Sequence, residues 1–184
     1  EQIGGPDTLL TSVMTHELGH LIDFMNAVNK DDCTEDKITG TFHCQFADDS
    51  FTALSWGKSA TYRRGERGPP PEHRALYPWL SQLCYYFCSQ PIPPAKIVDV
   101  YAELRGSSLL TSYSASSAME DFAEASMIYS LKKAGLSFSY DIHGKAGTLL
   151  FDFDAQWTAP QNQPKRLWLE AFFARPDLTY EFHP

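Results

Sequence analysis

Most apolar positions along the chain recur with helical spacing. The clearest pattern predicts a helix from about residue 7 to 29, with apolar positions at Leu9, Leu10, Val13, Met14, Leu18, Leu21, Ile22, Met25 and Val28. Asp7 or Thr8 can cap its start. A second amphipathic helix is predicted from Ser117 to about residue 134, where Gly135 can end it. Shorter helical patterns follow Pro93 and Lys165.

Two segments have the composition of β-strands. Residues 39–56 are rich in aromatic residues and threonine and are interrupted by the turn signal Asp48-Asp49-Ser50. Residues 148–157 alternate two sets of side chains as a strand does. The chain has 184 residues, 43% of them hydrophobic, without repeats or a low-complexity linker. We therefore expect one domain of a mainly helical α+β class with a small sheet.

The first predicted helix contains the motif His16-Glu17-Leu18-Gly19-His20. Histidines four positions apart lie on one side of a helix, so both imidazoles can bind one zinc ion. Glu17 can then act as the general base for a water molecule. A helix whose histidines are only hydrogen-bonded is the alternative. Asp23 could orient a ligand histidine or be an ordinary exposed acid.

A catalytic zinc ion usually has three protein ligands and one open position. The metzincin extension would require glycine and histidine where this chain has Asp23 and Asn26, so that class is excluded. Glu120 and Glu124 share one face of the second helix. Ser117 and Glu120 also match a capping box, in which the glutamate only bonds the start of its own helix. Glu120 thus stays open between ligand and cap, with Glu124 as the reserve ligand.

The motif from His16 to Asp23 combines with the segments Leu110-Thr111-Ser112-Tyr113 and Glu120-Asp121-Phe122-Ala123-Glu124-Ala125. Together they resemble the catalytic domain of anthrax lethal factor and the secreted bacterial Pro-Pro endopeptidases, which are zinc endopeptidases of the gluzincin type. The resemblance covers roughly residues 8–28 and 109–131, including the seven-residue step from Tyr113 to Glu120.

The resemblance implies a zincin-like catalytic domain in which His16, His20 and Glu120 bind zinc. It also implies that Glu17 is the general base and that Glu124 is an outer partner of the site. Tyr113 would be the phenol facing the scissile carbonyl, where it can stabilise developing negative charge.

The chain departs from these enzymes between the two blocks. His20 and Glu120 are 100 positions apart, much further than in the relatives, so residues 30–105 must hold an insertion. Residues 106–134 then form the tyrosine loop and ligand helix, and residues 135–184 form a C-terminal segment. Enzymes of this type place a sheet before the active-site helix, where its edge strand pairs with substrate. We expect either that strands in the insertion replace this sheet or that the chain is a fragment.

Composition restricts partners and location. The net charge of −8 argues against nucleic-acid binding, and no apolar run approaches the ~20 residues of a membrane span. No signal peptide remains. Four cysteines without a Cys-x-x-Cys pair indicate a secreted, disulfide-bonded protein.

Three pairings of Cys33, Cys44, Cys84 and Cys88 stay open. The last two lie in a helix predicted over residues 76–87, where β-carbons four residues apart are too distant for a regular disulfide. Free core thiols, or a structural zinc site with His43, are alternatives. His43, His73, His143 and His183 show no ligand spacing and are interpreted as structural or surface residues.

These features predict a secreted zinc-dependent endopeptidase with one Zn2+ per chain and a protein or peptide substrate. A catalytically inactive zincin-like binding or toxin-associated module is the alternative. The sequence contains no indication of cleavage specificity or of an oligomeric state.

Overall fold

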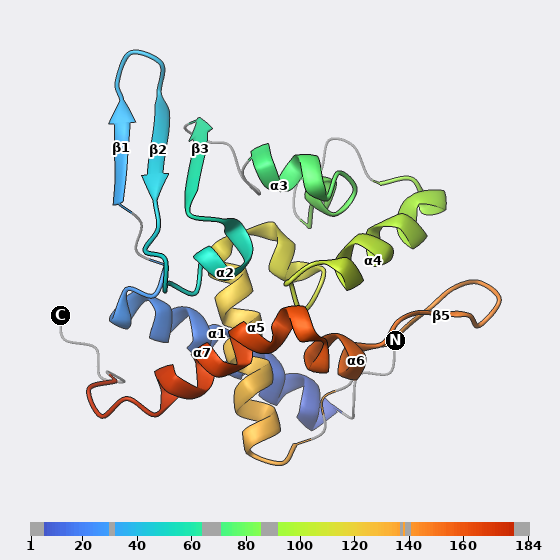
Figure 1. Ribbon diagram of the computed structural model, residues 1–184. Helices are drawn as coiled ribbons and strands as arrows, with labels where there is room; N and C mark the ends of the chain where they lie inside the picture. Colours follow the sequence, from blue (N-terminus) through green and yellow to red (C-terminus); the bar gives the residue numbers. More distant parts are fainter. Residues whose placement is uncertain are drawn as a thin grey trace.

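The structure is a computed structural model that describes residues 6–29, 32–63, 71–85, 92–136, 138 and 141–178. Most of these residues lie in helices, and the others include two small antiparallel sheets (Figure 1). The prediction of a mainly helical α+β chain is confirmed. Within the described residues, no helix is long and apolar enough to cross a membrane.

Four helices form the main body of the fold. They are α1 (Pro6–Asn26), α4 (Ile97–Gly106), α5 (Ala118–Lys133) and α7 (Gln163–Phe173). Three short helices and four 3-10 turns connect them, namely α2 (Ala53–Trp56), α3 (Pro71–Leu76), α6 (Phe153–Thr158), η1 (Leu80–Gln82), η2 (Pro94–Lys96), η3 (Tyr113–Ser116) and η4 (Pro160–Asn162). The helices predicted after Pro93 and Lys165 are thus confirmed as α4 and α7.

Helix α5 is the central element of the fold. It packs against α1, α7 and η3, and the helices cross it in Figure 1. Its start is capped by Ser117, whose hydroxyl accepts from the amide of Glu120, and Gly135 follows its end with a φ of 70°. Half of its residues are buried, and they lie on several sides of the helix. Helix α5 is therefore a core helix rather than the amphipathic helix predicted. The core includes Phe51, Leu80, Leu104, Phe122, Ile128, Phe151, Phe153 and Leu169.

Helix α1 ends at Asn26, slightly earlier than predicted, because Ala27 adopts a φ of 50°. The side chains of Asp7 and Thr8 lie outside the described part, so the predicted cap is not described. The side of α1 that packs on α5 consists of small and polar residues, including Ser12, His16 and Gly19. Most of the predicted apolar positions face outward instead. An apolar stripe usually marks the buried side of a helix, but in α1 most of it lies at the surface.

The segment between α1 and α4 contains a three-stranded antiparallel sheet, which projects from the helical body (Figure 1). Its strands are β1 (Asp32–Asp36), β2 (Thr41–Gln45) and β3 (Ser59–Arg63), in the order β1-β2-β3. Only β2 lies in the segment predicted to form strands. The predicted turn at residues 48–50 is confirmed, but residues 53–56 form α2, because Trp56 turns into the core.

One disulfide links the first two strands. Cys33 and Cys44 are directly paired in the β1–β2 register and are bonded. Cys84 is also disulfide-bonded, whereas Cys88 lies outside the described residues. The prediction of disulfides is confirmed, and none of the described cysteines is free.

Two further predictions need correction. The helix predicted over residues 76–87 does not form: Leu76 ends α3, and residues 77–85 contain only η1, because Pro78 cannot supply a helical amide hydrogen bond. Only Leu149–Phe151 of the second strand-like segment is a strand; this β5 pairs with β4 (Ile142–His143), and α6 follows it. Asp152 begins α6 because its carboxylate accepts from the amide of Ala155.

Candidate metal centre

The site forms where α1 crosses α5. Gly19 makes the close crossing possible, since a Cβ placed on it would lie 2.9 Å from the Cα of Ala123. His16 and His20, one turn apart on α1, lie on either side of this glycine in the sequence. Glu120 belongs to the first turn of α5. The crossing therefore brings two imidazoles and one carboxylate together from two distant parts of the chain.

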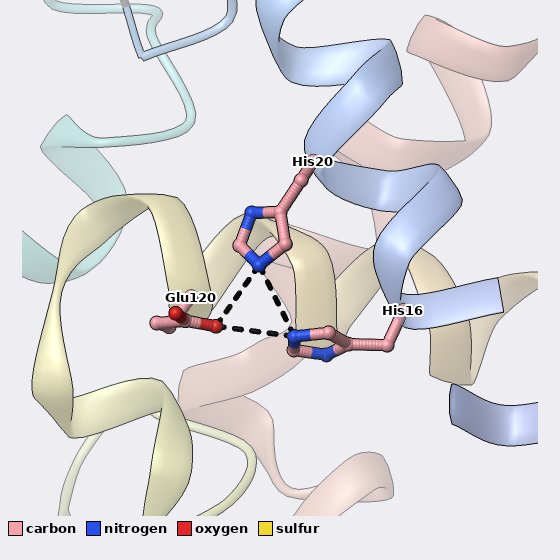
Figure 2. A group of neighbouring side chains, drawn as sticks. All are labelled: His16, His20 and Glu120. Carbon is pink, nitrogen blue, oxygen red and sulfur yellow. Dashed lines mark hydrogen bonds and ion pairs between the residues drawn. The ribbon is translucent and has the colours of Figure 1, made fainter. Parts of the chain in front are cut away.

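Figure 2 shows that the three side chains point toward one another. Nε2 of His16 lies 3.1 Å from Oε2 of Glu120, and Nε2 of His20 lies 3.1 Å from the same oxygen. The two Nε2 atoms are 3.2 Å apart. In a tetrahedral zinc site with ~2.0–2.1 Å bonds, ligand atoms are about 3.3–3.4 Å apart. The triangle thus has nearly the size of one face of such a site.

Among the described residues, His16, His20 and Glu120 form the group of three side chains that could hold a metal ion. His43 and His143 are exposed and instead contact Thr61 and the carbonyl of Gly147. The side chains of His73 and His183 lie outside the described part.

Glu120 combines features of both roles left open by the sequence. Its amide donates to the hydroxyl of Ser117 over 3.2 Å, so Ser117 caps α5 as predicted. Its carboxylate turns away from the helix start and faces the two histidines. The capping interaction therefore fixes the first turn of α5 and leaves the carboxylate available as a ligand.

Glu124 lies one turn further along α5 and contacts the other side of the His16 ring. Its Oε1 is 2.9 Å from Nδ1 of His16, which is an ion-pair distance. The angle at Nδ1 is not that of a hydrogen bond. Its Oε2 accepts a hydrogen bond of 2.7 Å from the hydroxyl of Thr111. Glu124 is thus placed to hold a proton on Nδ1, which leaves Nε2 with a lone pair toward the triangle.

His16 and Glu120 shift each other's pKa. Burial lowers the pKa of His16, but the hydrogen bond with Glu120 and the nearby negative charges of Glu124 and Glu120 outweigh this effect and raise the pKa to about 9. Burial raises the pKa of Glu120, while His16 and His20 lower it more, so the net shift is downward. Two carboxylates thus surround the His16 ring. Such an anionic, oxygen- and nitrogen-rich environment fits a divalent cation.

Tyr113 lies in η3, just before α5. Its ring centroid is 5.7 Å from that of His16, and its hydroxyl donates to Oε1 of Glu120 over 3.4 Å. The ring of Tyr85 meets it edge-on at 4.8 Å. The segment between α4 and α5 therefore places the phenol of Tyr113 at the triangle. The contact of Tyr85 with this phenol could not be predicted from the sequence.

Glu17 is exposed on α1, and its carboxylate has no hydrogen bond or ion pair with any described residue. It is therefore available to a water molecule or substrate. Asp23, by contrast, is buried, and its two carboxylate oxygens accept from the backbone amide and the side-chain amide of Asn29. These bonds fasten the chain after α1, so Asp23 is engaged by Asn29 rather than by a histidine.

A buried ion pair begins at Asp121, the residue that follows Glu120 in α5. Asp121 accepts two hydrogen bonds from Nζ of Lys165 on α7, at 2.5 and 2.7 Å, and one from the indole of Trp56 at 3.2 Å. Burial raises the pKa of Asp121 and lowers that of Lys165. The pair ties the first turn of α5 to α7. Sequence spacing could not reveal it, because the partners are 44 positions apart.

Comparisons of the chain with protein-family models, with curated proteins and with solved structures found no match.

Proposed function

We propose that this chain is a zinc-dependent endopeptidase that hydrolyses peptide bonds in a protein or peptide substrate. The observation that carries the proposal is the triangle of donor atoms from His16, His20 and Glu120, with edges of 3.1–3.2 Å. Glu17, whose carboxylate has no hydrogen-bond or ion-pair partner among the described residues, follows His16 on the same helix.

The donor set favours zinc among the common metal ions. Two imidazoles and one carboxylate are a known ligand set of catalytic zinc sites, which keep one position open. A hard cation such as Mg2+ or Ca2+ prefers oxygen ligands alone. When bound, zinc would supply a Lewis acid that polarises a carbonyl oxygen and acidifies a water molecule.

The side chains of this chain would divide the remaining work. Glu17 would accept a proton from the attacking water and pass it to the leaving amine. The hydroxyl of Tyr113 would donate a hydrogen bond to the carbonyl oxygen as negative charge develops there. Glu124 and Thr111 would keep the His16 ring in one tautomer and orientation.

Peptide bonds are the proposed substrate because the same residues carry the resemblance to gluzincin endopeptidases. The disulfide between Cys33 and Cys44 supports an extracellular location, where such bonds persist.

The test combines metal content with cleavage. Protein purified without chelators should contain about one zinc ion per chain and should cleave members of a peptide library. Glu17→Gln should keep the zinc and lose most activity, because an amide cannot accept the proton from water. Glu170→Gln, which changes an exposed carboxylate on α7, is the matched control and should retain activity. Absence of zinc, or full activity in Glu17→Gln, would contradict the proposal.

A further inference from the structure

Tyr85 meets Tyr113, the proposed hydrogen-bond donor to the developing negative charge. Its ring stands edge-on to the ring of Tyr113, with 4.8 Å between the centroids and 89° between the planes. Aromatic pairs favour this arrangement, because the electropositive edge of one ring then faces the electronegative face of the other. The turn η1, which precedes Tyr85, also packs against η3, which contains Tyr113. The contact therefore joins two separate segments of the chain next to the candidate metal centre.

The hydrogen bond of Tyr113 does not by itself fix the position of its phenol. The hydroxyl donates to Oε1 of Glu120 over 3.4 Å, which is long compared with ~2.7–2.8 Å for a typical bond between two oxygens. In the proposed reaction the hydroxyl must also leave Glu120 and donate to the carbonyl oxygen. Contacts of the ring then decide where the hydroxyl points. The described ring contacts are with His16, at 5.7 Å and a tilt of 42°, and with Tyr85.

The segment that carries Tyr85 is anchored to the rest of the fold. The backbone amides of Trp79 and Leu80 both donate to Oε2 of Glu103 on α4, over 2.9 and 2.8 Å. Leu80 is buried in the core. Cys84, directly before Tyr85, is disulfide-bonded. A charged acceptor, a buried side chain and a covalent link thus hold the backbone that leads to Tyr85.

Tyr85 does not belong to the hydrophobic core. Its side chain is 40% exposed, and the residues of the core do not include it. Truncation of an exposed side chain usually changes the stability of a protein little. An anchored but exposed ring that contacts Tyr113 therefore points to a role at the site rather than in the core.

We propose that Tyr85 is a positioning residue for Tyr113. Its ring holds the phenol in the orientation from which the hydroxyl can donate to the carbonyl oxygen beside the triangle of His16, His20 and Glu120. The inference rests on the proposed function. A donor stabilises the developing charge only when it lies ~2.7–3.1 Å from that oxygen, so rotational freedom of the phenol lowers kcat. The contact joins the two rings, so the role does not require the hydroxyl of Tyr85.

The test compares three single variants in steady-state kinetics on a peptide that the wild type cleaves. Tyr85→Ala removes the ring and should lower kcat about two- to tenfold, as expected for the loss of one aromatic pair, with KM and zinc content unchanged. Tyr85→Phe keeps the ring and should retain the wild-type kcat. Tyr129→Ala is the matched control, because it removes a half-buried tyrosine that stacks on Phe173, about 13 Å along α5 from Glu120. The control should leave kcat unchanged.

A double variant separates this role from a general loss of structure. In Tyr113→Phe the hydroxyl is already absent, so its orientation no longer matters to the reaction. Adding Tyr85→Ala to Tyr113→Phe should therefore lower kcat no further. A further fall as large as that caused by Tyr85→Ala alone would mean that the two residues act independently, and it would overturn the inference.

The mobility of the Tyr113 ring provides a readout that does not depend on catalysis. Nuclear magnetic resonance relaxation of isotope-labelled tyrosine rings measures this mobility, and the experiment is done in the presence of a chelator. The Tyr113→Phe variant identifies the signal of Tyr113. The ring should become more mobile in Tyr85→Ala but not in Tyr85→Phe. A ring that stays equally rigid in Tyr85→Ala would overturn the inference.

The outcomes distinguish this inference from the proposed function. If the wild type cleaves peptides and Tyr85→Ala has the same kcat, the inference is overturned and the proposed function is left intact. A lower kcat or a higher KM in Tyr85→Phe would show that the hydroxyl of Tyr85 contacts the substrate, which also overturns the inference. A wild type that cleaves no peptide removes the proposed function, and the mobility of the Tyr113 ring then still decides whether Tyr85 holds it.

Discussion

The close crossing at Gly19 makes metal binding sensitive to a single methyl group. In Gly19→Ala, the new Cβ would lie 2.9 Å from the Cα of Ala123 and 2.5 Å from the hydroxyl oxygen of Ser126. The hydroxyl can rotate away, although it now donates to the carbonyl of Ala123. The backbone of Ala123 cannot, so α1 must move away from α5.

The size of the effect follows from these distances. Carbon atoms attract best at about 3.5–4.0 Å, so the helices must separate by roughly half an ångström or more. Alanine favours a helix over glycine by about 1 kcal/mol, whereas overpacking costs about 1–3 kcal/mol. The expected net loss of stability is therefore about 0–2 kcal/mol. The same movement separates His16 and His20 from Glu120 and should weaken zinc affinity by about tenfold or more.

Thermal denaturation and competitive zinc titration measure the two effects. Gly106→Ala is the matched control, because Gly106 ends α4 with open space where its Cβ would lie. That variant should gain up to about 1 kcal/mol and keep wild-type zinc affinity. A Gly19→Ala protein that is stabilised like Gly106→Ala and binds zinc normally would refute the role assigned to this crossing.

Four further changes test other parts of the site. Tyr113→Phe should lower kcat by ~10²–10³ with zinc content unchanged, and steady-state kinetics with metal analysis would reveal a merely structural tyrosine as a loss of zinc or fold. Glu124→Ala should weaken zinc affinity by about 10–100-fold, measured by competitive titration; unchanged affinity would remove it from the site. Asp121→Asn leaves Lys165 buried without its anion and should cost about 3–5 kcal/mol in urea unfolding, whereas a loss below ~1 kcal/mol would mean that the pair is solvated. In the presence of a chelator, the raised pKa of His16 stabilises the fold fully at pH values below 6.5, its ordinary pKa, and this stabilisation should disappear as the pH rises to about 9. The melting temperature should therefore fall over this pH range in the wild type and vary less with pH in His16→Gln.

Features of the site that depend on local spacing could be predicted from the sequence. The four-residue spacing of His16 and His20 fixes their common side on α1, and Ser117 caps α5 through a contact three residues away. The relation between Glu120 and the histidines was predicted only through the resemblance to zinc endopeptidases, because 100 positions separate Glu120 from His20. Local propensity does not determine which distant helix crosses α1.

The errors have a common physical cause. The apolar pattern of α1 correctly predicted a helix but not its buried side, because α5 approaches at Gly19, where small residues allow the helices to touch. Leu54 and Trp56 were interpreted as strand residues, yet the burial of Trp56 and its hydrogen bond to Asp121 favour a helical turn over residues 53–56. In both cases, contacts with remote elements outweighed the local pattern.

The most direct test of the account is to locate the metal ion. Anomalous diffraction at the zinc edge from crystals of the zinc-loaded protein should show one peak between α1 and α5. It should lie ~2.0–2.2 Å from Nε2 of His16, Nε2 of His20 and an oxygen of Glu120. A peak elsewhere, or no peak in protein that is otherwise folded as described, would contradict the assignment of this triangle as the metal centre.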